Sequence, residues 1–548
     1  MPKLTVDGKA IEVPAGTNLI ETARQLGIEV PHYCYHPGLP IAGACRLCMV
    51  DLDKAPRPTI ACNTLAADGM AVLTETPRVL ELRRSVMEWH LINHPLDCPV
   101  CDQAGECWLQ IYYMQHGLYE SRMIDDKVHK PKAVPIGPHV MLDAERCILC
   151  SRCVRFCDTI TKTGELGIFH RGDHSELGLF PGTVLDNAYS GNVVDICPVG
   201  ALTDRDFRFQ ARVWYLDRAK SVCPGCARGC NIEVHTNRRR AHHAQGRRVV
   251  RLKPRFNADV NQWWICDEGR YGFQDIDAPT RLERPALREN GTLRPLGWEE
   301  AAATLAAGLR AAGPEGTGVV LSSRMTNEDL WLARRLFVDT LGVRLVDFRV
   351  PLARPGSADD LLRVADKAPN ARGAELLGLG AAGDRDAWPV LEAARSGRLR
   401  LLWVFDHDLL DSGWPGADVE EALAGVEGLV FQGPTAHATS GRAHVVLPSA
   451  VYAEREGTWT NVLGRVQRFW PAVAPRGEAR ADWEILAGVA GALGHDWRPL
   501  RPERLFRDLA AHVPAFAGLS YKTLGDHGAP VAGVSAGPQA EGRPRVAS

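Results

Sequence analysis

The chain has 548 residues, enough for several domains that each bury a hydrophobic core. Hydrophobic residues make up 45% and charged residues 24%, as in ordinary globular proteins, and the net charge of −2 gives no general attraction to nucleic acid or acidic membranes. No run approaches the roughly 18 apolar residues that would span a bilayer, so we expect no direct membrane span.

Cysteines are confined to the first half of the chain. All 16 lie between Cys34 and Cys266, and the following 282 residues contain none. The opening segment, MPKLTVDGKAIEV, lacks the basic-then-apolar order of a signal peptide, so we expect a cytosolic or peripheral protein. Thiols in a reducing compartment rarely persist as disulfides, and metal binding is therefore the leading explanation.

The first ligand group has the pattern C-x10-C-x2-C-x13-C and consists of Cys34, Cys45, Cys48 and Cys62. Before it, KLTVDGKAIEV predicts a hairpin, and NLIETARQLG predicts a helix capped by Asn18 and ended by Gly27. Hairpin, helix and cysteine loop follow the order of a ferredoxin-type domain with a [2Fe–2S] cluster. A structural zinc is the alternative, but zinc sites usually pair two CxxC knuckles.

The second group lies in HPLDCPVCDQAGEC, pattern H-x3-C-x2-C-x5-C, and consists of His94, Cys98, Cys101 and Cys107. Imidazole replaces thiolate on iron in Rieske centres, and the loss of a negative ligand raises the reduction potential. A lone histidine near cysteines is also often a structural hydrogen-bonding group. His90, one helical turn earlier, competes for the role, so spacing alone leaves the fourth ligand open.

The third group follows the bacterial ferredoxin run CILCSRCVRFC, which is typical of a [4Fe–4S] cluster. The Cys-Pro signature of such runs occurs later, at Cys197 in DICPVGAL, whereas Cys157 is followed by Asp158. Cys197 has no neighbouring triad with which to build a second cluster. We therefore predict that Cys157 is a buried free thiol, with exchanged roles as the alternative. The predicted ligands are Cys147, Cys150, Cys153 and Cys197.

The fourth group begins with C-x2-C-x3-C and ends with a distant cysteine; its members are Cys223, Cys226, Cys230 and Cys266. This spacing suits another [4Fe–4S] cluster. The four groups use 15 of the 16 cysteines, which argues against coincidence.

The order of these motifs resembles the large iron–sulfur subunit of bacterial NADH:quinone oxidoreductase, respiratory complex I. The resemblance implies that His94 is a cluster ligand, and it supports Cys197 over Cys157. It also implies that the fourth cluster occurs only in some bacterial members and lies off the main electron path.

After WICDEGRYGF the chain resembles the molybdopterin oxidoreductase superfamily, notably at residues 366–378 and 445–469. The apolar runs GVVLSS, RLVDF, RLLWVF and GLVFQ alternate with helical segments such as NEDLWLARRLFVDTLG. This alternation predicts an α/β architecture with a mostly parallel sheet. The segment has no cysteine and is short for enclosing a bulky cofactor, so no molybdenum is expected.

We therefore expect α+β ferredoxin-like iron–sulfur domains followed by an α/β Rossmann-like, molybdopterin-oxidoreductase-type domain. The expected cofactors are one [2Fe–2S] and three [4Fe–4S] clusters. The expected segments are a [2Fe–2S] domain at 1–78, the domain of the second group at 79–118, a ferredoxin-like [4Fe–4S] domain at 119–215, a fourth-cluster domain at 216–272, the α/β domain at 273–530 and a disordered tail at 531–548.

Two further motifs suggest other functions. GLGAAG at 378–383 matches a dinucleotide-binding pattern, but AELL before it is a poor strand, and Asp406 lies 28 residues after Gly378, farther than the pattern requires. The basic stretch at 237–255 has no interleaved aromatic residues and lies between the third and fourth cysteines of a ligand group. Neither NAD nor nucleic-acid binding is expected, and a solvated face or an acidic subunit suits the basic stretch better.

The resemblance implies a subunit that conducts electrons without its own NADH or quinone site. Electrons would come from a flavin- and NADH-binding subunit, pass onto the first and second groups, and leave through the third group toward quinone-module subunits. A small [2Fe–2S] subunit is a further expected partner, and the expected location is peripheral, on the cytoplasmic side of the inner (plasma) membrane. The alternatives are a subunit of an NAD-linked formate dehydrogenase or hydrogenase, and a multi-zinc scaffold.

Overall fold

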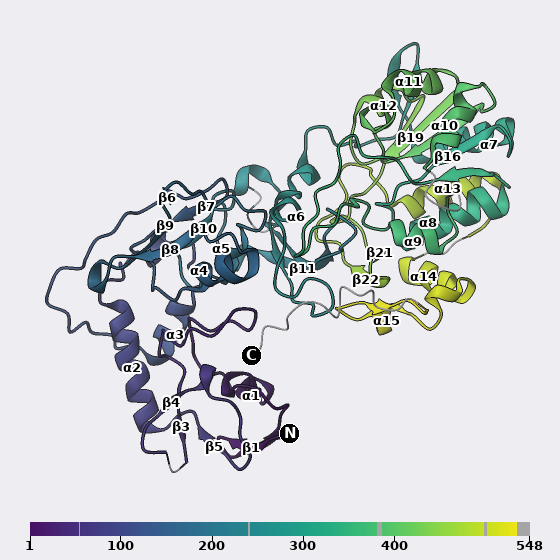
Figure 1. The fold of residues 1–548 in the computed structure, drawn as a ribbon. Coiled ribbons are helices and arrows are strands. Elements are labelled where there is room, and N and C mark those ends of the chain that lie inside the picture. Colours follow the sequence, from purple (N-terminus) through teal and green to yellow (C-terminus); the bar gives the residue numbers. More distant parts are fainter. Residues whose placement is uncertain (54, 239, 241, 381–385, 498–500, 534–548) are drawn as a thin grey trace. The chain divides into compact units, whose positions relative to one another are not determined.

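The computed structural model describes residues 1–53, 55–238, 240, 242–380, 386–497 and 501–533. The chain forms two compact units (Figure 1). The first contains Met1–Leu216 and the described part of Arg239–Gly246, and the second contains Asp217–Arg238 and the described residues from Arg247 to residue 533. The fourth ligand group therefore belongs to the same unit as the α/β domain.

The first unit opens with a five-stranded sheet in the order β2-β1-β5-β3-β4. Its strands are β1 (Lys3–Val6), β2 (Lys9–Glu12), β3 (Met49–Leu52), β4 (Thr59–Ile60) and β5 (Ala71–Leu73). The predicted hairpin is confirmed, with positive φ at Asp7 and Gly8, as a tight two-residue turn requires. Helix α1 (Leu19–Gln25) is also confirmed, and the Asn18 side chain accepts the Glu21 N–H at 2.9 Å.

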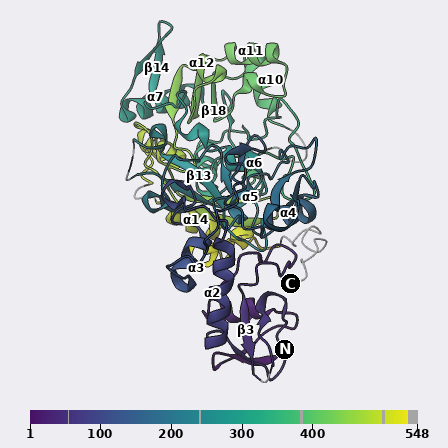
Figure 2. The same cartoon turned by 90° about the vertical axis from the view of Figure 1, so that its left-hand side faces the viewer.

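Two helices flank the loop that contains the second ligand group. Helix α2 (Pro77–Leu91) starts at Thr76, whose hydroxyl accepts the Val79 N–H, and it lies beside β3 in both views (Figures 1 and 2). Helix α3 (Trp108–His116) begins directly after Cys107. The ligand loop is thus held between the end of one helix and the start of the next.

The remainder of the first unit surrounds the third group with short elements. A three-stranded sheet has the order β10-β7-β6, from β10 (Leu202–Asp204), β7 (Val140–Leu142) and β6 (Val134–Pro135). A hairpin is formed by β8 (Leu166–Phe169) and β9 (Glu176–Leu179). Helix α4 (Arg152–Phe156) continues into a π-helical turn at Cys157–Thr161, and α5 (Asn192–Ile196) ends at Cys197.

The second unit begins with an antiparallel sheet of β11 (Asp217–Val222), β12 (Asn231–Thr236) and β13 (Val249–Pro254), followed by α6 (Asp267–Tyr271). A seven-stranded sheet follows in the order β15-β14-β20-β19-β18-β16-β17. Its strands are β14 (Ala286–Glu289), β15 (Thr292–Pro295), β16 (Thr317–Val320), β17 (Leu345–Asp347), β18 (Leu401–Phe405), β19 (Gly428–Gly433) and β20 (Val445–Pro448). The last five are mutually parallel, which confirms the predicted mostly parallel sheet and its four predicted strands.

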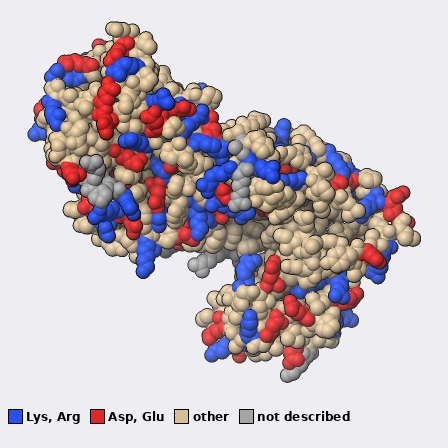
Figure 3. Space-filling view, turned by 180° about the vertical axis from the view of Figure 1, so that it is seen from behind, with Lys and Arg blue, Asp and Glu red and all other residues tan. Residues whose placement is uncertain are grey.

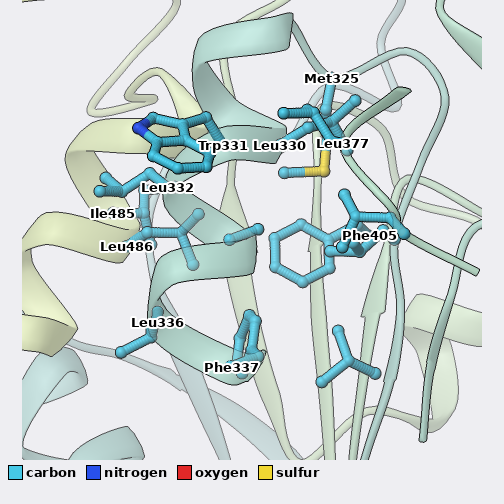
Figure 4. Close-up of a cluster of buried hydrophobic side chains, with 14 of the residues drawn as sticks. Met325, Leu330, Trp331, Leu332, Leu336, Phe337, Leu377, Phe405, Ile485 and Leu486 are labelled. Carbon is cyan, nitrogen blue, oxygen red and sulfur yellow. The ribbon is translucent and has the colours of Figure 1, made fainter. Parts of the chain in front are cut away.

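Helices accompany this sheet, as the α/β pattern predicts (Figure 1). They are α7 (Trp298–Ala312), α8 (Asn327–Ala333), α9 (Ala371–Leu376), α10 (Trp388–Arg395), α11 (Gly416–Ala424), α12 (Ala438–Arg442) and α13 (Asp482–Leu493). Thr326 and Asp329 form a capping box at the start of α8, which continues into a π-helical segment, Arg334–Thr340. The core beside it includes Leu336, Phe337 and Phe405 (Figure 4).

The end of the described chain corrects one expectation. A small sheet joins β21 (Gly457–Thr460), β22 (Arg465–Phe469) and β23 (Ala529–Pro530), and helices α14 (Pro502–His512) and α15 (Tyr521–Leu524) precede β23. Val531, assigned to the disordered tail, is buried and donates its N–H to Gly464 O at 2.9 Å. Val531 directly follows strand β23, and its apolar side chain packs in the core. Residues 534–548 lie outside the described part.

The GLGAAG motif does not have the structural context of a dinucleotide-binding loop. GLGAAG follows helix α9 rather than a strand, and its residues 381–383 lie outside the described part. Across the described residues, no helix has the length and apolarity needed to cross a bilayer. Acidic and basic side chains are interspersed on the face shown in Figure 3.

Candidate iron–sulfur sites

The first group lies in two adjacent pairs of buried cysteines. Cys34 hydrogen-bonds with Cys45, and Cys48 hydrogen-bonds with Cys62. Positive φ angles at Gly43 (62°) and Arg46 (58°) turn the loop, and the Tyr33 N–H points at Cys45 Sγ at 3.4 Å. Each iron of a [2Fe–2S] cluster takes two protein ligands, so paired thiols fit this cofactor.

The second group lines one cavity in full, with His94, Cys98, Cys101 and Cys107 around it. His94 Nδ1 is buried and has no hydrogen-bond partner among the described residues. Burial lowers the pKa of His94 to about 4, which leaves the imidazole neutral near pH 7, the form that binds metal. A Cβ atom on Gly200 would lie 2.3 Å from Cys101 Sγ, so only glycine fits this wall.

His90 has a different environment from His94. Its Nε2 lies 3.3 Å from the carbonyl oxygen of Cys45, and its ring packs edge-on against Tyr33 with a centroid distance of 5.1 Å. It is not among the residues that line the cavity of the second group. The structure thus brings His94, and not His90, to the three cysteines.

The third group also surrounds a cavity, lined by its four cysteines and by apolar side chains that include Ile168, Leu177 and Val199. Leu149 and Ser151 have φ angles of 54° and 57°, between residues of ordinary conformation. This alternation turns backbone N–H groups inward, a geometry that recurs at iron–sulfur sites. The Leu149 N–H accordingly points at Cys147 Sγ at 3.4 Å.

Cys157 lies outside that cavity. It is fully buried, its thiol hydrogen-bonds with Glu165, and burial raises its pKa. Cys197 instead lines the cavity with the ferredoxin triad. The structure therefore brings Cys197, and not Cys157, to the ferredoxin triad.

The fourth group is assembled by β11, β12 and α6. The Cys223 N–H donates to Cys230 O at 2.8 Å, and Cys266 caps α6 through a 3.4 Å contact with the Gly269 N–H. A Cβ atom on Gly269 would lie 2.8 Å from Cys223 Sγ. The same Cβ atom would lie 3.5 Å from Cys266 Sγ, so these two thiols approach the same point, and Cys230 lies within electrostatic range of the other three thiols.

The basic stretch connects β12 to β13, which pair as antiparallel strands. Arg248 within it pairs with Asp277 at 2.6 Å and with Glu454 at 2.8 Å. This part of the stretch is therefore bound within its own unit.

Buried thiols dominate the chemistry of these sites. Burial raises the pKa of Cys147 and Cys197 to about 12 and that of Cys266 to about 11, so each thiol would have to exchange its proton for a metal in order to bind one. In the described parts of the chain, no three His, Cys, Asp or Glu side chains are grouped closely enough to hold a single metal ion. A polynuclear cluster separates its ligands by its own iron and sulfide atoms, whereas the ligands of a single zinc ion converge on one point.

The first three sites are packed against one another. One hydrophobic cluster contains cysteines of all three groups, among them Cys34, Cys150 and Cys107. Val199 and Ala201 line the cavity of the third group, whereas Gly200 between them lines that of the second. The three sites therefore form one packed assembly within the first unit.

Several residues of this assembly were not singled out from the sequence. Arg152 and Arg155 lie between the first and third groups, and Gly200 separates the second from the third. Each is close in sequence to a predicted ligand, since the arginines are part of CILCSRCVRFC and the glycine is part of CPVG. That proximity was the only available signal.

Comparison with known proteins agrees with this geometry. The G subunit of NADH-quinone oxidoreductase from Rickettsia conorii is 30% identical over 604 aligned residues, which cover 90% of this chain and 88% of the relative. The chain belongs to the family of NADH-quinone oxidoreductase G subunits. Another relative, the mitochondrial NADH-ubiquinone oxidoreductase 78 kDa subunit of Neurospora crassa, is 30% identical and is covered over 80% of its length.

Models of individual domains match the chain in the order of its ligand groups. They are a 2Fe-2S iron-sulfur cluster binding domain at 2–77, the NADH-ubiquinone oxidoreductase-G iron-sulfur binding region at 83–122, the ferredoxin-like domain of NADH-quinone oxidoreductase subunit 3 at 137–203, a molybdopterin oxidoreductase Fe4S4 domain at 216–278 and molybdopterin oxidoreductase at 370–492. The chain therefore carries [2Fe–2S] and [4Fe–4S] binding domains ahead of a molybdopterin oxidoreductase domain.

A solved structure also shows similarity to the chain. The crystal structure of an NAD+-reducing [NiFe]-hydrogenase in the H2-reduced state is 29% identical over 39% of this chain and 91% of that chain. Its TM-score is 0.35, which is too low to carry a structural argument.

Proposed function

We propose that this chain conducts electrons through the three packed sites of its first unit, from a flavin- and NADH-binding subunit toward quinone-reducing subunits. The observation that carries this proposal is the single hydrophobic cluster that contains cysteines of all three groups. Each cluster, when bound, accepts and releases electrons. The chain's own residues fix the separation of the sites, exclude water from them and supply charges that set their potentials.

The packing supports an order of sites that differs from the expected one. The expected order ends at the third group, but this group has contacts with both of the others. The Arg155 guanidinium joins the carbonyl oxygens of Cys34 and Cys150, at 2.5 and 3.3 Å. On its other side, the third group shares the Val199–Ala201 wall with the second. We therefore place the third group in the middle and the second group at the exit.

The proposed cofactors are one [2Fe–2S] cluster in the first group and one [4Fe–4S] cluster in each of the others. His94 is the proposed fourth ligand of the second group, and Cys197 that of the third. The fourth group belongs to the second unit, and its cluster is proposed to lie off the main route. The α/β domain is proposed to hold no molybdenum.

The proposed surroundings follow from family membership. Members of this family are parts of an NADH-quinone oxidoreductase, so this chain works within a complex. We propose that its partners are the flavin- and NADH-binding subunit, a small [2Fe–2S] subunit and the quinone-module subunits. The proposed location is peripheral, on the cytoplasmic side of the inner (plasma) membrane.

A matched pair of cysteine variants tests the third site. Anaerobically reconstituted full-length protein is expected to hold about 14 irons, with a matching number of acid-labile sulfides. Cys153→Ser is expected to lose up to about four of these irons and the corresponding electron paramagnetic resonance (EPR) signal, whereas Cys157→Ser keeps both. Equal losses in the two variants would contradict the ligand assignment, and molybdenum near one atom per chain would contradict the function.

A second matched pair tests the histidine ligand. His94→Ala should alter or abolish the EPR signal of the second group, whereas His90→Ala should leave it in place. His94→Cys should retain a cluster at a lower potential, because a thiolate adds the negative charge that imidazole lacks. An unaltered signal in His94→Ala would show that this histidine is only structural.

A further inference from the structure

Two guanidinium groups, the buried one of Arg152 and the half-buried one of Arg155, lie between the first and third ligand groups. Arg152 is 2% exposed and donates one hydrogen bond to Ile196 O at 3.1 Å and another to Tyr35 O. Its guanidinium also stacks over the Trp108 ring, 4.7 Å from the centroid. Ile196 precedes a ligand of the third group and Tyr35 follows a ligand of the first, so one side chain spans both loops.

Arg155 makes the same kind of bridge one helical turn later. Its guanidinium donates to the carbonyl oxygens of Cys34 at 2.5 Å and of Cys150 at 3.3 Å, and also to that of Pro40. Its Nε donates to the Ser151 hydroxyl at 3.2 Å. Both arginines therefore bind neutral acceptors that belong to ligand loops.

Among the described residues, neither Arg152 nor Arg155 forms an ion pair with a carboxylate. The strongest electrostatic influences on both arginines come from ligand thiols, and Arg152 is also affected by Arg155. The arginine beside the second group differs, because Arg146 lies 3.0 Å from Asp97 and 3.4 Å from Asp143. Charge compensation is thus present at the second group and missing between the first and third.

A buried cation beside a half-buried cation, both without counter-ions, is an unfavourable arrangement. Clusters ligated by four thiolates carry net negative charge, and they would occupy the sites that these guanidinium groups face. The missing counter-charge is therefore supplied when both clusters are bound. Reduction adds a further negative charge, which a fixed cation stabilises.

We propose that Arg152 and Arg155 form a shared counter-ion that raises the reduction potentials of the first-group and third-group clusters together. This inference rests on the proposed function and extends it to two residues outside the ligand set. Because the same guanidinium groups hydrogen-bond both loops, they also hold the two sites at a fixed separation. They act as electrostatic and positioning residues rather than as ligands.

The test is an EPR-monitored redox titration of the full-length, cluster-loaded chain and of its Arg152→Gln and Arg152→Lys variants. In Arg152→Gln the ratio of reduced to oxidised cluster at a given potential should fall on the order of tenfold at both sites, which equals about 59 mV for a one-electron couple. Arg152→Lys keeps the charge and should retain most of the wild-type ratio. A purely structural role would not separate these two variants.

Arg212→Gln is the matched control. The Arg212 guanidinium donates to the carbonyl oxygens of Pro99 and Cys101, in the second ligand loop, and it is partly exposed. Its removal should leave the potentials of the first and third groups at their wild-type values. A shift of all sites in this control would mean that the Arg152 effect is non-specific, and it would overturn the proposal.

Other outcomes are equally decisive. Wild-type potentials in Arg152→Gln, a shift at only one of the two sites, or equal shifts in the Gln and Lys variants would each overturn the shared counter-ion. If Arg152→Gln fails to load iron, the Arg155→Gln and Arg155→Lys pair is titrated with the same expectations. A wild-type chain that binds no clusters would instead contradict the proposed function, so the two failures are distinguishable by iron content.

Discussion

The cores of the two units are built from different materials. In the first unit, the central hydrophobic cluster includes ligand cysteines from three groups, packed with residues such as Tyr33, Leu109 and Tyr112. In the second unit, the cluster that covers one face of the parallel sheet consists of aliphatic and aromatic side chains, among them Phe337, Trp403 and Phe405 (Figure 4). One core is organised around sites for inorganic clusters, and the other is closed by its own side chains.

This difference has energetic consequences. Cysteine buries little area, and the cavities of the second and third groups leave part of their walls without protein contacts. Cluster binding supplies those contacts and the counter-charge for buried cations, so its free energy is also folding free energy. The sheet needs no such contribution, because its interior side chains already pack against one another.

Removal of iron and sulfide should therefore produce the largest difference in stability between the two units. After anaerobic chelation of the full-length chain, amides in β7, β10 and α4 should lose on the order of 100-fold protection from hydrogen exchange, as local unfolding becomes accessible. Amides in β18 and β19 should keep their protection. Mass-spectrometric hydrogen exchange reports both regions in one sample, and equal losses would show that the sheet also depends on clusters.

A cavity in the second core should produce the opposite pattern. Phe337 is fully buried, with ring centroids 5.4 Å from Trp403 and 6.3 Å from Phe405. Phe337→Ala should lower the free energy of unfolding of the sheet by about 3 to 5 kcal/mol, while the EPR signals of the first unit keep their intensity. Val338→Ala is the control, since Val338 is 37% exposed and its truncation should cost less than about 0.5 kcal/mol.

Local sequence signals predicted much of both regions. The Asp-Gly turn, the Asn18 cap and the four parallel strands depend on neighbouring residues and on hydrophobic spacing, and each forms where expected. The cysteine groups were recognisable because cluster ligands recur at short, characteristic spacings. These features carry their information within about ten to twenty residues.

Features set by long-range packing were not predictable in the same way. The environments of His90 and His94 differ because the Cys45 loop meets one ring and the Gly200 segment encloses the cavity of the other. Arg152 can act on both the first and third groups only because the fold brings the Tyr35 and Ile196 loops to its guanidinium. Likewise, Val531 is buried where its N–H contacts Gly464 O, and no sequence pattern in the tail predicts this contact.

The smallest predicted effect is a pH dependence of the free energy of unfolding of the second unit. Glu328 is buried beside the sheet and accepts hydrogen bonds from the Thr458 N–H at 2.9 Å, the Thr458 hydroxyl at 3.0 Å and the Tyr521 hydroxyl at 2.8 Å. Burial is the largest influence and raises the pKa of Glu328 to about 7. In the unfolded chain the same carboxyl titrates near 4.3.

The sign of the pH effect follows from these two values. Below about pH 4 the carboxyl is protonated in both states, and its stabilising contribution is complete. As pH rises toward 7 the unfolded chain releases the proton while the folded chain retains it, so the sheet should lose roughly 2 to 3 kcal/mol. Glu328→Gln should remove most of this slope in urea unfolding between pH 5 and 7.5, whereas the exposed control Glu299→Gln should keep it. Because the slope belongs to a carboxyl in the second core, it should be the same with and without iron; a slope that disappears on chelation would mean that the two cores are coupled.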